Sequence, residues 1–368
     1  MSLAGSMYRG VLRPALFGLD AERAHGLAMH ALAVAHRSPA ACRALRALAG
    51  AADDGSLAVH ALGRRFTSPF GVAAGLDKGA EAYNALGALG FGCVEVGTVT
   101  ARAQDGNARP RLFRLPADRA LLNRMGFNNP GATVVAQRLA AVPPEGVVLG
   151  VNIGKSRAAS LDEAAADYAE SARLLAPFAA YVVINVSSPN TPGLRSLQSV
   201  EALAPIVRAV RAAMPAPAPP LLVKIAPDLA DEDIDAVTDL ARAEGLAGIV
   251  ATNTTLRRDG LVTPAEAVRA LGDGGVSGAP LRERSAAVVA RVFRRCAGEL
   301  TIVGAGGVFD ADDAWRLVEA GATLVQVYSG FVYQGPSLAR ELSAGLRARM
   351  RSEGVRDLAE LRGRRAAG

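Results

Sequence analysis

Three lysines are the first candidates for chemistry, because the chain otherwise uses arginine as its cation. Of 41 basic residues only Lys78, Lys155 and Lys224 are lysine. A lysine ammonium is a compact point charge that the planar guanidinium does not replace in a tight site. Asparagine is also rare, and five asparagines lie at or beside short apolar runs. These are Asn123, Asn152, Asn185, Asn190 and Asn253. Amides beside a lysine match an anionic ligand with several N–H and C=O groups.

Other reactive groups are sparser. All four histidines, including His25, precede residue 61, so the region that carries the lysines and asparagines lacks the usual general base. Asp77 could pair with Lys78 or cap a helix. The remaining groups that could transfer protons are Lys78, Lys155, Lys224, Ser187, Ser188 and Tyr328.

We expect no metal site and no disulfide. The chain has no H-x-x-x-H pair and no clustered carboxylates, and its cysteines Cys42, Cys93 and Cys296 lie far apart. This cysteine usage is typical of a reducing cytoplasm.

Eight short apolar runs alternate with helical patterns and would position these residues. The predicted strands lie near Gly71–Ala74, Cys93–Val96, Val147–Ile153, Tyr181–Val186, Leu221–Ile225, Gly248–Thr252, Thr301–Gly304 and Leu324–Tyr328. Such alternation predicts parallel strands with right-handed crossovers, and eight units are the number that a closed (β/α)8 TIM barrel requires. An open doubly wound sheet is the alternative, but no G-x-G-x-x-G follows the first strand.

Helical patterns separate these strands. They cover Leu161–Leu175, Glu201–Met214, Asp231–Glu244, Leu281–Cys296 and Ala311–Ala320. Before the first of them, Ser160 and Glu163 form a Ser-x-x-Glu capping box.

The polar residues fall at the carboxyl ends of the predicted strands, where barrels of this kind place their active sites. The glycines of 304–307, with Ser329 and Gly330, occupy the position after strands seven and eight where many barrels bind a phosphate. A mononucleotide such as FMN fits a phosphate site outside a dinucleotide-binding fold.

The chain is expected to have three parts. Residues 1–6 (MSLAGS) are interpreted as a cloning scar, 7–52 as an N-terminal segment of two or three short amphipathic helices, and 53–368 as the barrel. The helices would either plug the barrel or bind a membrane surface. Hairpin strands are predicted around His60–Phe66, with Gly63 in the turn, and Pro110–Leu115.

Composition excludes several classes of protein. The chain has 368 residues, 50% of them hydrophobic and 21% charged, which favours a large core over disorder. Its net charge of +6 is spread along the chain without aromatics between basic runs, so nucleic-acid binding is not expected. No signal peptide and no spanning segment are predicted.

Five motifs resemble the dihydroorotate dehydrogenase family. They are Ala74–Lys78 (AGLDK), Asn123–Asn128 (NRMGFN), Asn185–Arg195 (NVSSPNTPGLR), Ala251–Thr255 (ATNTT) and Gly275–Gly278 (GVSG). The serine before Pro189-Asn190 and the helical N-terminal segment with Leu19–His25 (LDAERAH) are similar to its class 2, which is membrane-associated and reduces quinones. This resemblance favours the membrane interpretation of the N-terminal helices.

The resemblance implies the roles of individual residues. Ser188, rather than the adjacent Ser187, would take a proton from C5 of dihydroorotate while C6 gives hydride to the flavin, although a free serine is a weak base and needs help. The substrate would be held by Lys78, Asn123, Arg124, Met125, Gly126, Phe127, Asn185, Asn190, Asn253 and Thr254. FMN would be held by Ala74, Gly75, Leu76, Asp77, Lys78, Thr98, Asn152, Asn185, Lys224, Thr252, Gly278, Gly307, Tyr328 and Ser329. The quinone would contact His25, Arg114 and Tyr328.

The resemblance also places the protein peripherally on the cytoplasmic face of the cell membrane. It leaves the role of Lys155 open between contact with the flavin and pairing with an acid. The alternatives are a soluble relative that uses fumarate or NAD, a Schiff-base aldolase using Lys224, and a non-enzymatic phosphate or nucleic-acid binder.

Overall fold

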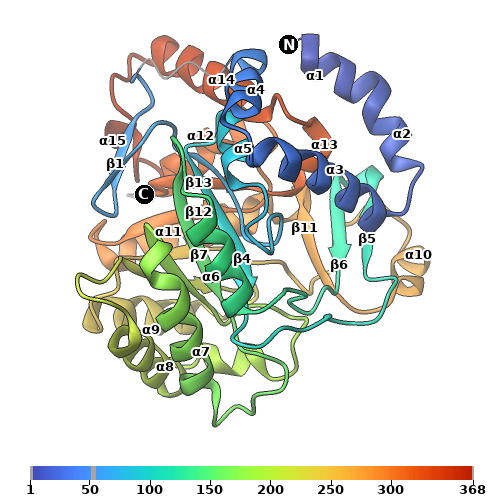
Figure 1. Cartoon of the computed structure of the whole chain (residues 1–368). Helices are drawn as coiled ribbons and strands as arrows, with labels where there is room; N and C mark the ends of the chain where they lie inside the picture. The colour runs from blue at the N-terminus through green and yellow to red at the C-terminus, as the bar shows by residue number, and fades with distance from the viewer. Residues whose placement is uncertain (1–2, 51–54, 367–368) are drawn as a thin grey trace.

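Eight parallel strands close into a barrel at the centre of the computed structural model, which describes residues 3–50 and 55–366 (Figure 1). The predicted fold class is confirmed, and every predicted strand end lies within three residues of the observed one. The strands are β3 (Phe70–Val72), β4 (Cys93–Val99), β7 (Val148–Ile153), β8 (Tyr181–Asn185), β9 (Leu221–Ile225), β10 (Gly248–Ala251), β12 (Thr301–Ala305) and β13 (Leu324–Val327). Pairing of β13 with β3 closes the ring.

Helices surround the barrel and bury the apolar outer faces of its strands. The reciprocal hydrogen bonds of the predicted capping box form: the Glu163 N–H donates to Ser160 Oγ over 3.2 Å and the Ser160 N–H donates to Glu163 Oε2 over 2.8 Å. They lie in the turn before α7, which begins at Ala164, three residues later than predicted. The α-helices of this part are α5 (Tyr83–Ala88), α6 (Ala132–Ala141), α7 (Ala164–Leu175), α8 (Val200–Ala213), α9 (Asp231–Ala243), α10 (Ala265–Ala270), α11 (Arg282–Cys296), α12 (Ala311–Ala320), α13 (Ser329–Gln334), α14 (Leu338–Ser352) and α15 (Leu358–Leu361). Short 3-10 turns are η2 (Pro116–Asp118), η3 (Ala176–Phe178), η4 (Leu194–Gln198) and η5 (Ala279–Leu281).

A hairpin closes the amino-terminal end of the barrel. Strands β1 (Val59–Ala61) and β2 (Arg64–Phe66) pair antiparallel, as predicted, and the two residues between them, Leu62 and Gly63, both have positive φ. Such a turn matches the twist of a two-residue hairpin. Leu62 and the fully buried Phe66 pack against inward-facing strand residues such as Tyr181. Because side chains fill the barrel interior at this end, the interior is open only toward the carboxyl ends of the strands.

A second small sheet stands beside the open end of the barrel. It has the antiparallel order β11 (Gly275–Gly278), β6 (Ala120–Asn123), β5 (Leu112–Leu115). The strand near Pro110–Leu115 was predicted, whereas β6 and β11 were not. This sheet brings Asn123 of β6 opposite Gly275 of β11, although the two residues are far apart in the sequence.

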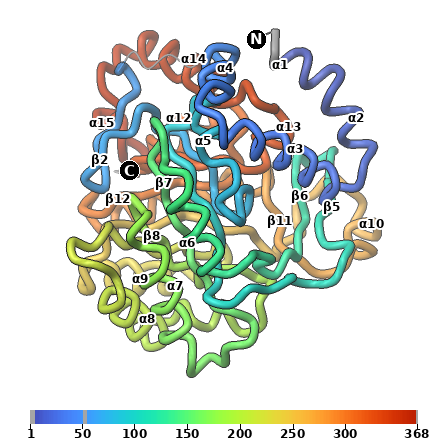
Figure 2. Tube along the Cα trace, viewed as in Figure 1, coloured from blue at the N-terminus to red at the C-terminus, as the bar shows by residue number. Residues whose placement is uncertain are grey.

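The N-terminal helices are α1 (Leu3–Met7), the π-helix η1 (Tyr8–Leu12), α2 (Arg13–Phe17), α3 (Ala21–His36) and α4 (Pro39–Ala49). Among them, η1 lies against α13, α3 against β5 and α5, and α4 against α5 (Figure 2). Asp20 caps α3 by accepting the N–H groups of Glu22 and Arg23. Ion pairs of Arg9 with Glu341 (2.9 Å) and of Arg111 with Glu22 (2.7 Å) hold the helices to the barrel.

The predicted division of the chain at residues 52 and 53 lies outside the described residues, as do residues 1 and 2 of the expected cloning scar. Within the described part, no helix combines the length and the apolar composition needed to cross a bilayer.

Candidate active site

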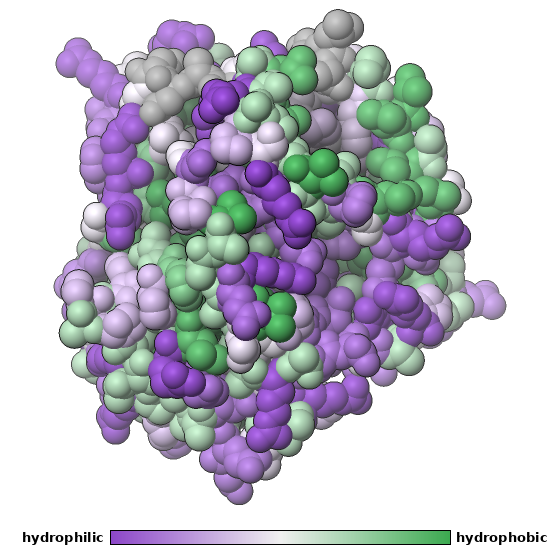
Figure 3. Space-filling view, in the orientation of Figure 1, coloured by the Kyte–Doolittle hydropathy of each residue, from purple (hydrophilic) through white to green (hydrophobic). Residues whose placement is uncertain are grey.

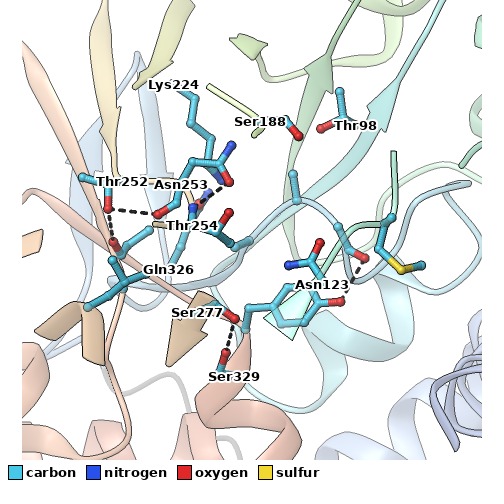
Figure 4. Close-up of a pocket in the computed structure, with 18 of the residues that line it drawn as sticks. Thr98, Asn123, Ser188, Lys224, Thr252, Asn253, Thr254, Ser277, Gln326 and Ser329 are labelled. Carbon is cyan, nitrogen blue, oxygen red and sulfur yellow. Dashed lines mark hydrogen bonds between the residues drawn. The ribbon is translucent and has the colours of Figure 1, made fainter. Parts of the chain in front are cut away.

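A cavity opens at the carboxyl ends of the barrel strands, beneath the small sheet (Figure 4). Most of the residues predicted to bind substrate or cofactor line it. These are Ala74, Gly75, Lys78, Thr98, Asn123, Met125, Gly126, Phe127, Asn185, Ser188, Asn190, Lys224, Thr252, Asn253, Thr254, Gly278, Gly307, Tyr328 and Ser329. The strand-end pattern in the sequence therefore locates one continuous site.

Amides and hydroxyls form a hydrogen-bonded chain across the barrel mouth. Asn185 Nδ2 donates to Thr98 Oγ1 over 2.9 Å, and Thr98 Oγ1 donates to Asn152 Oδ1 over 2.6 Å. On the other side, Asn253 Nδ2 donates to Asn185 Oδ1 over 3.3 Å. Each asparagine side chain is thereby fixed by another strand, so the polar surface of the cavity is rigid before a ligand binds.

The two adjacent serines face different ways. Ser188 lines the cavity, and its Oγ accepts the N–H of Asn190 over 3.3 Å. The Ser187 hydroxyl is fully buried, donates to Asn185 Oδ1 and accepts from Asn253 Nδ2 over 2.9 Å. Of the two serines, Ser188 is the one placed to meet a ligand.

Lys224 has a buried carboxylate nearby that the sequence analysis missed. Glu95 of β4 is fully buried inside the barrel, where it accepts Asn152 Nδ2 over 2.8 Å and Gln326 Nε2 over 2.6 Å. Burial lowers the pKa of Lys224, and the charge of Glu95 opposes that effect. The charge of Glu95 thus stabilises the positive charge of Lys224 in the barrel centre. The sequence pattern does not reveal this role of Glu95, because a single charged residue within a strand is usually expected to face solvent.

Lys78 forms the opposite side of the polar wall, close to α3. Burial lowers the pKa of Lys78 to about 8. His25 Nε2 lies 3.4 Å from Lys78 Nζ, and burial together with the Lys78 charge lowers the pKa of His25 to about 3. The neutral imidazole accepts from the ammonium and leaves its charge available to an anion.

Glycines and serines shape one end of the cavity. Gly306, Gly307 and Gly330 line it, and Ser277 and Ser329 share a hydrogen bond of 2.8 Å that Figure 4 shows. A Cβ on Gly330 would overlap the carbonyl oxygen of Val308, so this wall of exposed backbone requires glycine. Other lining residues absent from the predicted set are Ala73, Asn128, Leu281, Ala305, Val308, Gln326 and Val327.

Four predicted contacts do not line this cavity. Asp77 is fully buried and accepts the N–H groups of Glu81 and Ala82, each over 2.8 Å, so it caps the turn after Lys78. Asn152 lies one layer below, between Thr98 and Glu95. The other two are Leu76, which lines the adjoining cavity that also contains His25, and Arg124.

Arg124 and Arg114, one of the three quinone-site candidates, bind backbone. Arg124 donates to the carbonyls of Leu271, Asp273 and Pro110 and so ties three loops together. Arg114 donates to the carbonyls of three residues at the turn between α2 and α3, over 2.8 to 3.4 Å, and stacks on the ring of Phe17.

Lys155, whose role the sequence left open, is also bound to backbone. Its buried ammonium donates to the carbonyls of Ser156 (3.0 Å) and Ala159, and Asp167 contributes only a charge effect. Lys155 therefore closes the loop after β7 and does not line the cavity.

Comparison with known proteins gives one consistent family. Residues 56–350 match the family model described as dihydroorotate dehydrogenase. A dihydroorotate dehydrogenase (quinone) of Kineococcus radiotolerans is 55% identical over 94% of this chain and 96% of its own, and one of Rhodococcus erythropolis is 52% identical over 96% and 98%. The crystal structure of the Eimeria tenella enzyme in complex with ferulenol superimposes with a TM-score of 0.81 at 37% identity, covering 85% of this chain and 89% of that one.

Proposed function

The chain belongs to the dihydroorotate dehydrogenase family, and we propose that its barrel-mouth cavity binds FMN and dihydroorotate side by side, with Ser188 as the base. Its reaction is the oxidation of dihydroorotate in pyrimidine biosynthesis with a quinone as electron acceptor. The family is flavin-dependent. The observation that carries the proposal is the single cavity that joins Lys78, Ser188, Lys224 and the glycine-lined wall.

The residues present fit FMN. Exposed backbone at Gly306, Gly307 and Gly330 suits a phosphate, which binds well to converging N–H groups. Among the described residues, three buried side-chain oxygens of the cavity lining have no partner within the protein, namely Asn128 Oδ1, Thr254 Oγ1 and Gln326 Oε1. Such atoms are costly unless a ligand satisfies them. When bound, the flavin supplies the two-electron acceptor that links dihydroorotate to quinone.

The chain's own residues would orient the substrate. Lys78 supplies the charge that a carboxylate needs, and Asn123, Asn190 and Asn253 supply amides for the ring N–H and C=O groups. Asn190 Nδ2 donates to Asn123 Oδ1 over 3.2 Å, so these two amides already have fixed orientations. A ring held on both sides presents C5 to Ser188 in one geometry, which is how positioning accelerates proton transfer.

Ser188 needs help to act as a base, since a serine hydroxyl is weakly basic. It is 6% exposed, so few water molecules compete for its oxygen. To take the proton from C5, Ser188 must pass its own hydroxyl proton to a water molecule. The backbone N–H of Asn190 donates to the same oxygen and stabilises the negative charge that this transfer leaves on it. Arg124, Leu76, Asp77 and Asn152 would support the site through the loops and side chains that they bind, without touching the ligands.

The N-terminal helices are proposed to attach the protein to the membrane and to admit the quinone past Arg114, His25 and Tyr328. Among the described residues, seven of the eleven exposed large apolar side chains lie on or between these helices: Met7, Val11, Leu12, Leu19, Leu27, Val34 and Leu48. Figure 3 shows the resulting hydrophobic surface over α1 and α2. An apolar helical face of this kind binds in the interfacial layer of a bilayer. We propose that this attachment is to the cytoplasmic face of the cell membrane.

The cofactor assignment is tested by denaturing the purified protein and identifying the released flavin by chromatography and mass. FMN at about one per chain is expected. Release of FAD, or of no flavin from a folded protein, would overturn the assignment. Comparing ubiquinone or menaquinone analogues with fumarate and NAD as acceptors tests the second half-reaction in the same preparation.

A further inference from the structure

Arg195 connects the two loops that carry the reactive side of the cavity. It lies in η4, at the end of the segment that follows Ser188. Its Nε donates to the carbonyl oxygen of Ser187 over 3.1 Å, and its Nη2 donates to the carbonyl oxygen of Thr254 over 2.8 Å. Ser187 follows β8 and Thr254 follows β10, so one guanidinium spans the carboxyl end of β9 between them.

The end of β9 supplies the counter-charge. Arg195 Nη1 donates to Asp228 Oδ2 over 2.7 Å, and Asp228 also accepts the hydroxyl of Thr255 and the N–H of Leu256. Burial alone would raise the pKa of Asp228, but these hydrogen bonds and the Arg195 charge lower it. Asp228 therefore stays ionised and anchors both Arg195 and the segment after Thr254.

This arrangement determines where Ser188 lies. The Ser187 carbonyl belongs to the peptide bond that leads into Ser188, so the hydrogen bond from Arg195 fixes the orientation of that peptide. The same guanidinium holds the carbonyl oxygen of Thr254, and both Thr254 and the preceding Asn253 line the cavity. The hydrogen bond therefore fixes the backbone of this wall as well. The planar fork presents several donors in fixed relative directions, which a lysine ammonium does not reproduce.

We propose that Arg195 is a positioning residue that sets the distance between Ser188 and the Asn253–Thr254 wall. The proposal rests on the assignment of Ser188 as the base. Arg195 itself does not line the cavity, so it acts through the backbone of the two loops and not on the ligands.

The first test replaces Arg195 by lysine. Lysine keeps the positive charge beside Asp228 but cannot donate to the Ser187 and Thr254 carbonyl oxygens in the fixed directions of the planar guanidinium. The rate of flavin reduction at saturating dihydroorotate, followed anaerobically by stopped-flow absorbance, should fall about 10- to 100-fold, because small misplacements of a reacting group cost that much. The affinity for the product orotate, measured by titration of the flavin spectrum, should weaken by a smaller factor than the rate, because Lys78, Asn123 and Asn190 still line the cavity. Asp228→Asn should act in the same direction but less strongly.

Arg291→Lys is the matched control. Arg291 is similarly exposed (27% against 21%), and it also binds aspartates, Asp235 and Asp231, but between α9 and α11 on the outer wall. Both lysine variants should keep a similar Tm, and Arg291→Lys should keep the wild-type rate. A rate in Arg195→Lys as high as in Arg291→Lys would overturn the proposal.

A double variant separates positioning of Ser188 from a general structural role. If Arg195 acts through Ser188, Arg195→Lys should cause little further loss in a Ser188→Ala background. A full additional loss there would overturn the proposal while leaving the base assignment intact. An undiminished rate in Ser188→Ala alone would instead overturn the base assignment on which the proposal rests.

Discussion

Lys78 should lose its charge at moderately alkaline pH, and Lys78→Arg should abolish that loss. Burial lowers the pKa of Lys78 from 10.5 to about 8; Glu22 and Asp77 oppose the shift, whereas Arg111 adds to it. The difference corresponds to about 3 kcal/mol against the charged form. Because a cation is present below its pKa and lost above it, the group that receives the substrate carboxylate should be charged at pH 7 and only about one-tenth charged at pH 9.

The consequence is an alkaline limb in the kcat/KM for dihydroorotate, which reports the free enzyme. The kcat/KM should be constant near pH 7. Above about pH 8 it should decrease, by a factor that approaches ten for each pH unit. The kcat should stay constant to a higher pH, because the bound substrate carboxylate stabilises the ammonium of Lys78 and raises its pKa. Lys78→Arg should give a lower plateau but no limb, since a guanidinium stays charged throughout this range.

Initial rates between pH 6 and 10 with a soluble quinone analogue measure both profiles. The kcat/KM for quinone at saturating dihydroorotate is the internal control and should lack the Lys78 limb. An alkaline fall near pH 8 that persists unchanged in Lys78→Arg would refute the reasoning, as would a wild-type profile that is flat to pH 9.5.

Three further variants test separate parts of the account. Ser188→Ala should retain flavin but slow its reduction about 10²- to 10⁴-fold in stopped-flow experiments, and an unchanged rate would contradict its role as base. Arg114→Ala should raise the KM for quinone several-fold with little effect on flavin reduction, because its guanidinium binds the turn between α2 and α3; equal losses in both half-reactions would argue against a quinone-side role. Val11→Asp with Val34→Asp should weaken co-sedimentation with anionic vesicles, whereas Val262→Asp, at a position that is 75% exposed but remote from the N-terminal helices, should not. Equal effects of the two changes would exclude the proposed membrane face.

The barrel could be predicted because its signals are local. Runs such as Leu221–Ile225 are apolar except for Lys224 and lack the polar–apolar alternation of a half-exposed strand, as expected for buried parallel strands, and the observed β9 has the predicted limits. The polar residues that follow each run then identify the cavity without knowledge of its shape, since all strand ends of a barrel meet at one rim.

The residues that were missed or placed differently depend on contacts between distant segments. Strands β6 and β11 stabilise each other in the small sheet, and the four residues of β11 include two glycines, which weaken any strand signal. Glu95 and Gln326 meet only inside the closed barrel. Arg124 belongs to a motif beside the cavity, but its side chain finds carbonyl acceptors on other loops. The spacing of residues in the sequence does not predict which way such a side chain points.

The most direct measurement of the central claim is the visible spectrum of the purified protein under anaerobic conditions. Addition of dihydroorotate should bleach the flavin bands, and subsequent addition of a quinone analogue should restore them, with orotate formed in an amount equal to the flavin reduced. Flavin bands that remain unchanged on addition of dihydroorotate, or reduced flavin that fumarate reoxidises as fast as quinone does, would contradict the account.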